Sequence, residues 1–165
     1  MRTNSKTPPV KAHLLAPVTQ LDFFDSQSCI LSQKVTALAA WNNIRTQPVP
    51  FVRLAFRVRD AISTCFGVKP IGGFSRTEME KVSKGEHLDF FLVEHIAPDV
   101  LTLTARDRHL DVMTCITVDE NTVSVTSSVI THNMFGRIYM IPVAIAHRLI
   151  VRRSLAQLSS GHISI

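Results

Sequence analysis

The fold of this chain is decided by residues 101–132, LTLTARDRHLDVMTCITVDENTVSVTSSVITH, together with the apolar segment that continues to Leu158. Three stretches here alternate apolar and polar residues, which is the pattern of β-strands that bury one face. Short polar sequences at Asp107-Arg108 and at residues 119–122 separate the three stretches. We therefore predict three antiparallel strands joined by two tight turns.

The turns also predict which residues face each other. A two-residue turn at Asp107-Arg108 places Leu103 opposite Val112, and the turn at 119–122 places Val112 opposite Val129. One face then gathers Leu101, Leu103, Ala105, Leu110, Val112, Ile116, Val118, Val123, Val125 and Val129, interrupted by Thr114, Ser127 and Thr131. A slip of one residue would destroy this separation, so the pattern favours a one-sided antiparallel sheet.

The apolar segment that follows is expected to cover this face as a helix from Met134 to about Leu158, with Asn133 as its cap. Gly136 and Pro142 predict a kink or a short lead-in before a regular helix begins at Pro142. The predicted apolar stripe of this helix consists of Ile138, Ile141, Ile145, Leu149 and the stem of Arg152.

The first half of the chain predicts a short strand, two helices and another strand. The strand spans Ser26–Leu31, and Ser32 caps a first helix that carries Val35, Leu38, Trp41 and Ile44 at helical spacing. A second helix starts at Pro50, with a stripe of Phe51, Leu54, Ala55, Val58, Ile62, Cys65 and Phe66, and ends at Gly67. Residues 88–93 read as a further strand, which makes the chain α+β.

Composition indicates one globular domain. The 165 residues are 45% hydrophobic, and we place a flexible basic tail at residues 1–12 and a single domain at 13–165. The net charge is +5, but the basic residues are scattered along the chain, which argues against a nucleic-acid-binding face. Gly72-Gly73 reads as a turn, not a phosphate loop, so no cofactor is predicted.

Cysteine usage and hydropathy predict the compartment. Cys29, Cys65 and Cys115 are too few and too far apart for a disulfide framework or a metal site, which favours a reducing environment. The first twelve residues do not resemble a signal peptide. The longest uncharged apolar run near the C-terminus, 138–146, has nine residues, well short of the roughly 20 that span a bilayer. We expect a soluble cytoplasmic protein.

The order of these elements resembles the START-like (SRPBCC, helix-grip) superfamily. Local sequences are also similar to a narrower bacterial family of unknown function, whose domain either stands alone or follows a Rossmann-type domain resembling short-chain dehydrogenases. The similar stretches are Arg59-Asp60 before Phe66-Gly67, Arg108-His109-Leu110-Asp111, and Gly136-Arg137-Ile138-Tyr139 with His147 beyond it. This chain departs from that family at Ile145, where the family has a proline. The proline of this chain, Pro142, lies one helical turn earlier.

The resemblance implies a curved sheet that grips the C-terminal helix and encloses an apolar cavity. The cavity-lining candidates are Leu103, Val112, Thr114, Ile116, Val125, Ser127, Val129, Tyr139, Ile145 and His147. We expect the cavity to bind a small apolar molecule. Two alternatives stay open: an enzyme of the cyclase, dehydratase or hydrolase kind, and an accessory module that forms a homodimer or docks on a partner domain.

Polar residues outside this set have simpler interpretations. His109, Asp111 and His132 meet at one end of the predicted sheet, but structural ion pairs, with Arg106 or Arg108 as partners of Asp111, are favoured over a metal site. Cys115 is expected to be buried and inert. His147 is either a structural helix residue or the polar handle of the pocket, with Glu94 and Tyr139 as weak partners. The sequence predicts no catalytic and no metal-binding residue.

Overall fold

The computed structural model describes residues 2–4, 7–46 and 81–160, and shows an antiparallel sheet with helices on one side. The strands are β1 (Arg2–Asn4), β2 (Phe23–Ile30), β3 (His87–Leu88), β4 (Phe91–Ala97), β5 (Val100–Arg106), β6 (Leu110–Asp119) and β7 (Thr122–Thr131). The helices are α1 (Ala37–Thr46), α3 (Met134–Ser159) and a 3-10 turn, η1 (Val18–Gln20).

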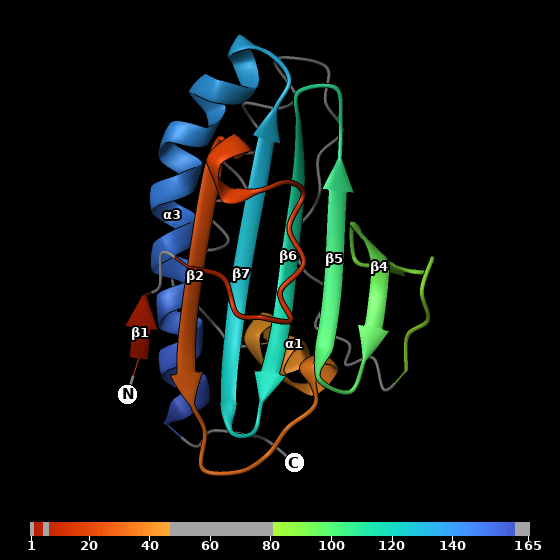
Figure 1. Ribbon diagram of the computed structural model, residues 1–165, viewed down its shortest axis with the longest axis vertical. Helices are drawn as coiled ribbons and strands as arrows, with labels where there is room; N and C mark the ends of the chain where they lie inside the picture. The colour runs from red at the N-terminus through yellow and green to blue at the C-terminus, as the bar shows by residue number, and fades with distance from the viewer. Residues whose placement is uncertain (1, 5–6, 47–80, 161–165) are drawn as a thin grey trace.

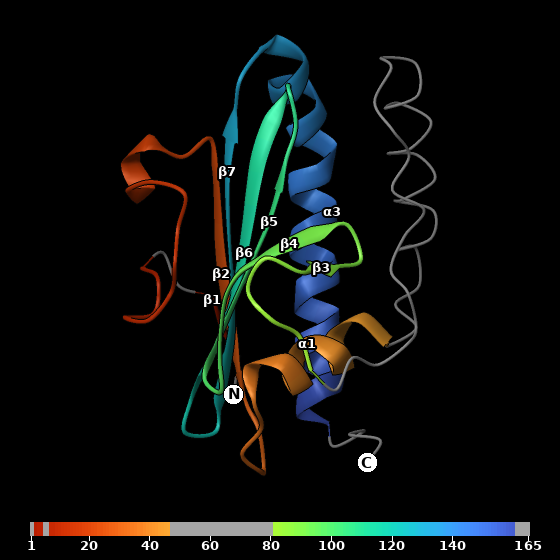
Figure 2. The same ribbon diagram turned by 90° about the vertical axis from the view of Figure 1, so that its right-hand side faces the viewer.

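The seven strands lie in the order β1-β2-β7-β6-β5-β4-β3. Figure 1 shows α1 and α3 behind the sheet, and Figure 2 shows the sheet edge-on between these helices and the N-terminal segment. The predicted α+β class, the antiparallel sheet and the long C-terminal helix are confirmed. The second predicted helix, with Cys65, and the Gly72-Gly73 turn lie outside the described residues.

The two predicted hairpins have different outcomes. Val112 faces Val129 in the β6–β7 pair, as predicted. In the β5–β6 pair Leu103 faces Thr114 rather than Val112. Asp107 causes this difference, because its Oδ1 accepts hydrogen bonds from the backbone N–H groups of His109 and Leu110 and so widens the turn. The shift is two residues, which leaves every side chain on its predicted face.

Element boundaries in the first half are corrected by local contacts. β2 begins at Phe23 rather than Ser26. α1 begins at Ala37, and Thr36 rather than Ser32 caps it, with its Oγ1 accepting from the Ala39 N–H at 3.2 Å. The strand predicted over 88–93 is split into β3 and β4 by a turn in which Asp89 is left-handed, with φ 59°.

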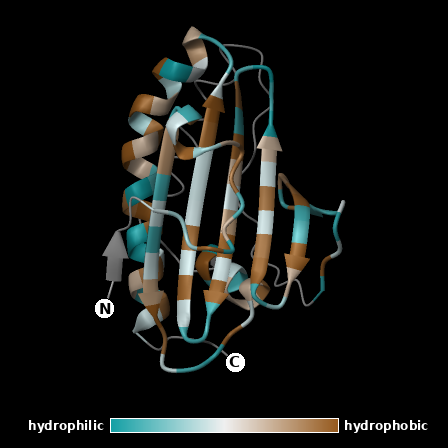
Figure 3. Cartoon of the chain, viewed as in Figure 1, coloured by the Kyte–Doolittle hydropathy of each residue, from teal (hydrophilic) through white to brown (hydrophobic). Residues whose placement is uncertain are grey.

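The inner face of the sheet, which faces α1 and α3, holds the core. Hydrophobic and polar residues alternate along β5 and β6 (Figure 3). The main cluster joins this face to both helices, through residues that include Trp41, Leu101, Ile116, Val125, Val151, Leu155 and Leu158. The apolar residues of the three predicted strands therefore share one side of the sheet and point toward the helices.

The outer face of the sheet is covered as well. Residues 7–22 cross it in front of the sheet (Figure 1), and the backbone N–H of Leu15 donates to Ser128 Oγ at 3.2 Å. Hydroxyl pairs across neighbouring strands, such as Ser26 with Thr126 at 3.0 Å, satisfy one another beneath this cover. Part of the segment predicted as a tail is packed too, since Lys11 binds Asp99 and β1 pairs with β2.

The orientation of α3 differs from the prediction because of Gly136. A Cβ added at Gly136 would lie 2.4 Å from the backbone oxygen of His109, so only glycine permits this approach of helix to sheet. The helix face that carries Gly136 therefore packs inward. The predicted inward stripe points to solvent instead: Ile138, Ile141, Ile145 and Leu149 are 62%, 66%, 60% and 50% exposed.

α3 is one continuous helix from Met134 to Ser159 that includes Pro142, so the residues predicted as a lead-in are already helical. Its cap is the predicted one, since Asn133 Oδ1 accepts from the Gly136 N–H at 3.0 Å. By length and apolar composition, α3 is also the one helix in the described ranges that could cross a membrane. Core helices of soluble proteins meet the same criteria.

Candidate functional site

A row of polar side chains crosses the otherwise apolar inner face. Asp25 on β2 pairs in register with Ser127 on β7, and Ser127 pairs with Thr114 on β6. All three residues are buried, and the hydroxyls of Thr114 and Ser127 are 3.2 Å apart. We call Asp25, Ser127 and Thr114 the polar belt.

α3 crosses the β2 end of the polar belt and brings Arg148 to it. Arg148 Nε lies 3.5 Å from Asp25 Oδ1, and its guanidinium carbon lies 5.1 Å from the centre of the Phe23 ring. Gln27, two residues along β2, donates from Nε2 to Asp25 Oδ2 at 2.7 Å and to the Arg148 carbonyl at 3.2 Å. These contacts hold the buried carboxylate of Asp25 and tie α3 to the edge of the sheet.

The belt divides the interior into two apolar clusters. On the side toward the N-terminus of α3, Phe23, Val129 and Met140 form a small cluster, joined by partly buried Val112 and Tyr139. The large cluster described above lies on the other side. A small apolar cluster thus adjoins a set of fixed polar groups, which is the composition typical of ligand-binding sites.

His147 is the least satisfied polar residue of this region. Its ring packs edge-on against Phe23, with centres 5.6 Å apart, and its Nε2 is buried without a hydrogen-bond partner among the described residues. Burial lowers the pKa of His147 below the ordinary value of 6.5, the Asp25 carboxylate opposes this shift, and Arg148 adds to it. His147 is therefore a neutral imidazole near neutral pH.

This lowered pKa predicts a dependence of stability on pH. Well above pH 6.5 His147 is neutral in both the folded and the unfolded chain. As the pH falls below 6.5 toward the folded pKa, the unfolded chain takes up the proton first, so the free energy of unfolding decreases. We measure the free energy of unfolding in urea at several pH values across this range. H147Q is expected to lose part of the decrease at low pH, while H87Q, at an exposed histidine, keeps it. An unchanged pH dependence in H147Q would show that folding does not lower the pKa of His147.

The predicted cavity-lining residues divide into two groups. Nine of them lie on the inner face of the sheet or on the side of α3 that packs there: Leu103, Val112, Thr114, Ile116, Val125, Ser127, Val129, Tyr139 and His147. Ile145 is corrected, because at 60% exposure it lies on the opposite side of α3. Glu94 is not near this interior, since it accepts from Thr104 Oγ1 at 2.9 Å on the outer face.

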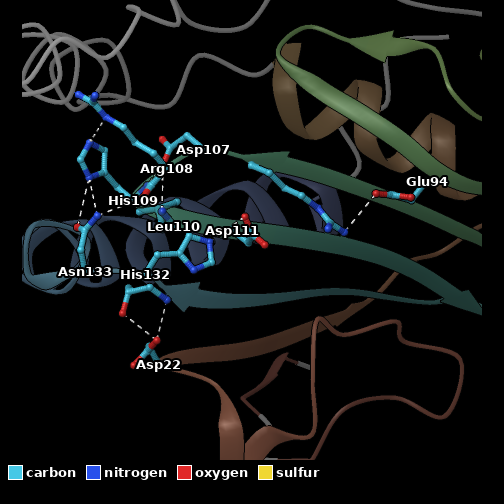
Figure 4. Close-up of polar contacts among 11 residues, drawn as sticks. Asp22, Glu94, Asp107, Arg108, His109, Leu110, Asp111, His132 and Asn133 are labelled. Atoms are coloured by element: carbon cyan, nitrogen blue, oxygen red, sulfur yellow. Dashed lines mark hydrogen bonds and ion pairs between the residues drawn. The ribbon is translucent and has the colours of Figure 1, made fainter.

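His109, Asp111 and His132 lie near one end of β6 and β7 (Figure 4), but their side chains do not converge on one point. His132 Nε2 lies 3.1 Å from Asp111 Oδ1, whereas the His109 ring turns to Asn133 and Arg108. Asp111 thus contacts His132 rather than Arg106, which lies 3.5 Å from Glu94 instead. No group of three or more His, Cys, Asp or Glu residues able to hold a metal occurs among the residues that the structure describes.

The nearby Asp22 is committed to the backbone. Its Oδ2 accepts from the N–H and the Oγ1 of Thr131, at 2.7 and 2.8 Å, and these two hydrogen bonds lower the pKa of Asp22. Cys115 lies on the outer face, where burial raises the pKa of its thiol and the His13 N–H donates to its sulfur at 3.4 Å. A raised pKa disfavours the thiolate, in agreement with an inert cysteine.

The sequence prediction missed Asp25, Gln27 and Phe23, which form the β2 end of the site. The predicted strand began at Ser26, so Phe23 and Asp25 lay outside it. Two adjacent phenylalanines, Phe23 and Phe24, interrupt the alternation of apolar and polar residues there. An alternating pattern begun at Phe23 would have placed Asp25 and Gln27 on the apolar face.

A model of the family described as "Protein of unknown function (DUF2867)" matches residues 18–154. The chain belongs to this family. The match runs from η1 into α3, so the DUF2867 region includes the polar belt, His147 and Gly136. No curated protein and no solved structure matches the chain. The sheet and C-terminal helix of this DUF2867 protein are compatible with a helix-grip fold.

Proposed function

We propose that the protein is a START-like domain that binds a small, largely apolar molecule between the inner face of the sheet and α3. The observation that carries this proposal is the buried, unpartnered Nε2 of His147 beside the polar belt. Buried polar atoms in folded proteins nearly always have a hydrogen-bond partner, and leaving one without costs about 1–3 kcal/mol. A ligand hydroxyl or carbonyl at His147 would remove that cost.

The surroundings of His147 favour a mostly apolar ligand. Phe23, Val129, Met140 and Val112 offer hydrocarbon surface, and burial of such surface contributes about 25 cal/mol per Å². Thr114 and Ser127 add hydroxyls that both donate and accept, so they suit a neutral polar group. Asp25 is already held by Gln27 and Arg148, which makes it a fixed part of the wall rather than a free binding group.

The enzyme alternative lacks an acid–base pair here. In the described part of the chain, no hydrogen bond joins His147 to a carboxylate, and the Asp25 contacts go to Gln27 and Arg148. General acid–base catalysis needs groups within hydrogen-bond reach of the reacting atoms and of each other. Binding is therefore the function that these contacts support best.

Native mass spectrometry of the protein purified from its own host tests the proposal. We expect a mass above that of the chain, which returns to the chain mass on denaturation. H147F keeps the ring volume but removes Nε2, and S127A removes one hydroxyl of the belt. Each variant is expected to lower ligand occupancy, by roughly five- to a hundredfold in affinity for H147F.

Ser124 gives the matched control. It lies on β7 like Ser127 and pairs with a hydroxyl across the strands, Ser28 at 2.8 Å, but on the outer face. S124A should therefore keep the bound mass. Equal losses in S124A and S127A, or a bare chain mass together with no saturable binding of the apolar probe N-phenyl-1-naphthylamine, would contradict the proposal.

A further inference from the structure

α3 carries a second apolar surface that the proposed ligand site does not use. Met134, Ile138, Ile141, Ile145 and Leu149 follow one another along its outer side, and each is at least half exposed. We call these five residues the α3 stripe. Figure 3 shows hydrophobic residues recurring along the helix. Soluble domains seldom leave so many large aliphatic side chains in one exposed line, so the α3 stripe indicates a contact surface.

The charges on α3 indicate what kind of surface it contacts. The helix contains four arginines, Arg137, Arg148, Arg152 and Arg153, and no aspartate or glutamate. At 3.6 residues per turn, Arg137 and Arg148 flank one side of the α3 stripe, Arg153 flanks the other, and Arg152 continues its line. Arg137, Arg152 and Arg153 are exposed, although Arg152 and Arg153 also have contacts within the protein, and Arg148 reaches back to Asp25 and Phe23. An apolar line bordered by positive charge is complementary to an anionic, apolar partner.

A second copy of the chain fits this surface poorly. Stable protein interfaces engage about 20–30 residues on each side, whereas the α3 stripe is one side chain wide. Pairing two α3 helices would also bring together eight arginines without one acidic residue on either helix (four per helix). A lipid surface has neither difficulty, because acyl chains accept a narrow apolar line and headgroups accept the flanking cations.

We propose that the α3 stripe docks the protein on the surface of an anionic lipid bilayer. The isoleucines would enter the boundary between headgroups and acyl chains, to a depth of about 5–10 Å. The inner side of α3 stays on the sheet, held by the close approach of Gly136 to His109 and by Leu155 and Leu158 in the core. The helix would therefore lie along the membrane surface rather than cross it.

Vesicle co-sedimentation of the full chain tests this docking. We expect binding to phosphatidylcholine vesicles with about one quarter phosphatidylglycerol, little binding to phosphatidylcholine alone, and release as salt rises toward about 0.5 M. The I141S/I145S variant should lose roughly tenfold or more of the partition coefficient. I30S is the matched control, because Ile30 is 52% exposed on β2, away from α3, and should bind like the original chain.

Three results would overturn the proposal, once circular dichroism shows that the variants keep their melting midpoints. One is equal partitioning of I141S/I145S and the original chain. Another is a dimer in sedimentation velocity that I141S/I145S dissociates, which would assign the α3 stripe to a second copy. The last is slow maleimide labelling of I141C in the absence of vesicles, which would show that another part of the protein covers the α3 stripe. We expect fast labelling without vesicles and slower labelling when anionic vesicles are added.

Discussion

Replacing Asp89 by asparagine is expected to lower the free energy of unfolding by about 3 kcal/mol, measured by urea unfolding. Asp89 Oδ2 accepts from Arg45 Nη1 at 2.9 Å, and the two side chains are 5% and 1% exposed. Removing one charge from a buried pair takes away a strong attraction in a medium of low polarity. Asparagine also suits the left-handed backbone of residue 89, so the loss would report the charge and not the turn.

The exposed pair of Lys11 with Asp99 is the control. Its N–O distance, 2.6 Å, is shorter than that of the buried pair, but both side chains are open to solvent. D99N should leave the unfolding midpoint almost unchanged, because water and salt screen such pairs. If D89N and D99N behaved alike, the α1 contact with the β3–β4 turn would not be a buried ion pair.

Replacing Gly136 by alanine is expected to destabilise the fold by about 2 kcal/mol, which corresponds to a melting midpoint lower by roughly 4–8 °C. The new Cβ would meet the backbone oxygen of His109, which no side-chain rotation can remove. Alanine gains up to about 1 kcal/mol in helix propensity, so the steric loss must exceed this gain.

I138A, two residues further along the same helix, is the control. Ile138 is 62% exposed, so its truncation should change the free energy of unfolding by less than about 0.5 kcal/mol. A melting midpoint that rises in G136A would mean that α3 does not approach His109, and the inward face of the helix would need to be reassigned.

The three central strands could be predicted from sequence because alternation and turns agree there. The predicted register of the β5–β6 pair is wrong by two residues. The predicted face of each residue is still correct, since a shift of two residues preserves the side-chain direction. Thr114 and Ser127 were found in the same way, as polar positions on an otherwise apolar face, whereas His147 was named from the family resemblance.

The orientation of α3 could not be predicted from periodicity, because the helix is apolar on two sides. Ile138, Ile141 and Ile145 form the more regular stripe, whereas the packed side mixes Gly136, Met140, His147 and Ser154 with aliphatic residues. The steric fit at Gly136, rather than the hydrophobicity of either side, determines which side of α3 packs on the sheet. Asp25 escaped prediction because the strand was begun at Ser26, and its partner Arg148 is more than a hundred residues away.

Because the polar belt separates two apolar clusters, the two halves of α3 are held by different amounts of buried apolar surface. The first half of α3 packs on the small hydrophobic cluster that contains Phe23, Val129 and Met140. The second half packs in the large cluster, which contains Leu155 and Leu158. Lifting the first half exposes only the smaller cluster, so this fluctuation costs less than opening the whole domain. The first half of α3 is thus held by fewer buried apolar side chains than the second half, and a ligand of the proposed site would enter on that side.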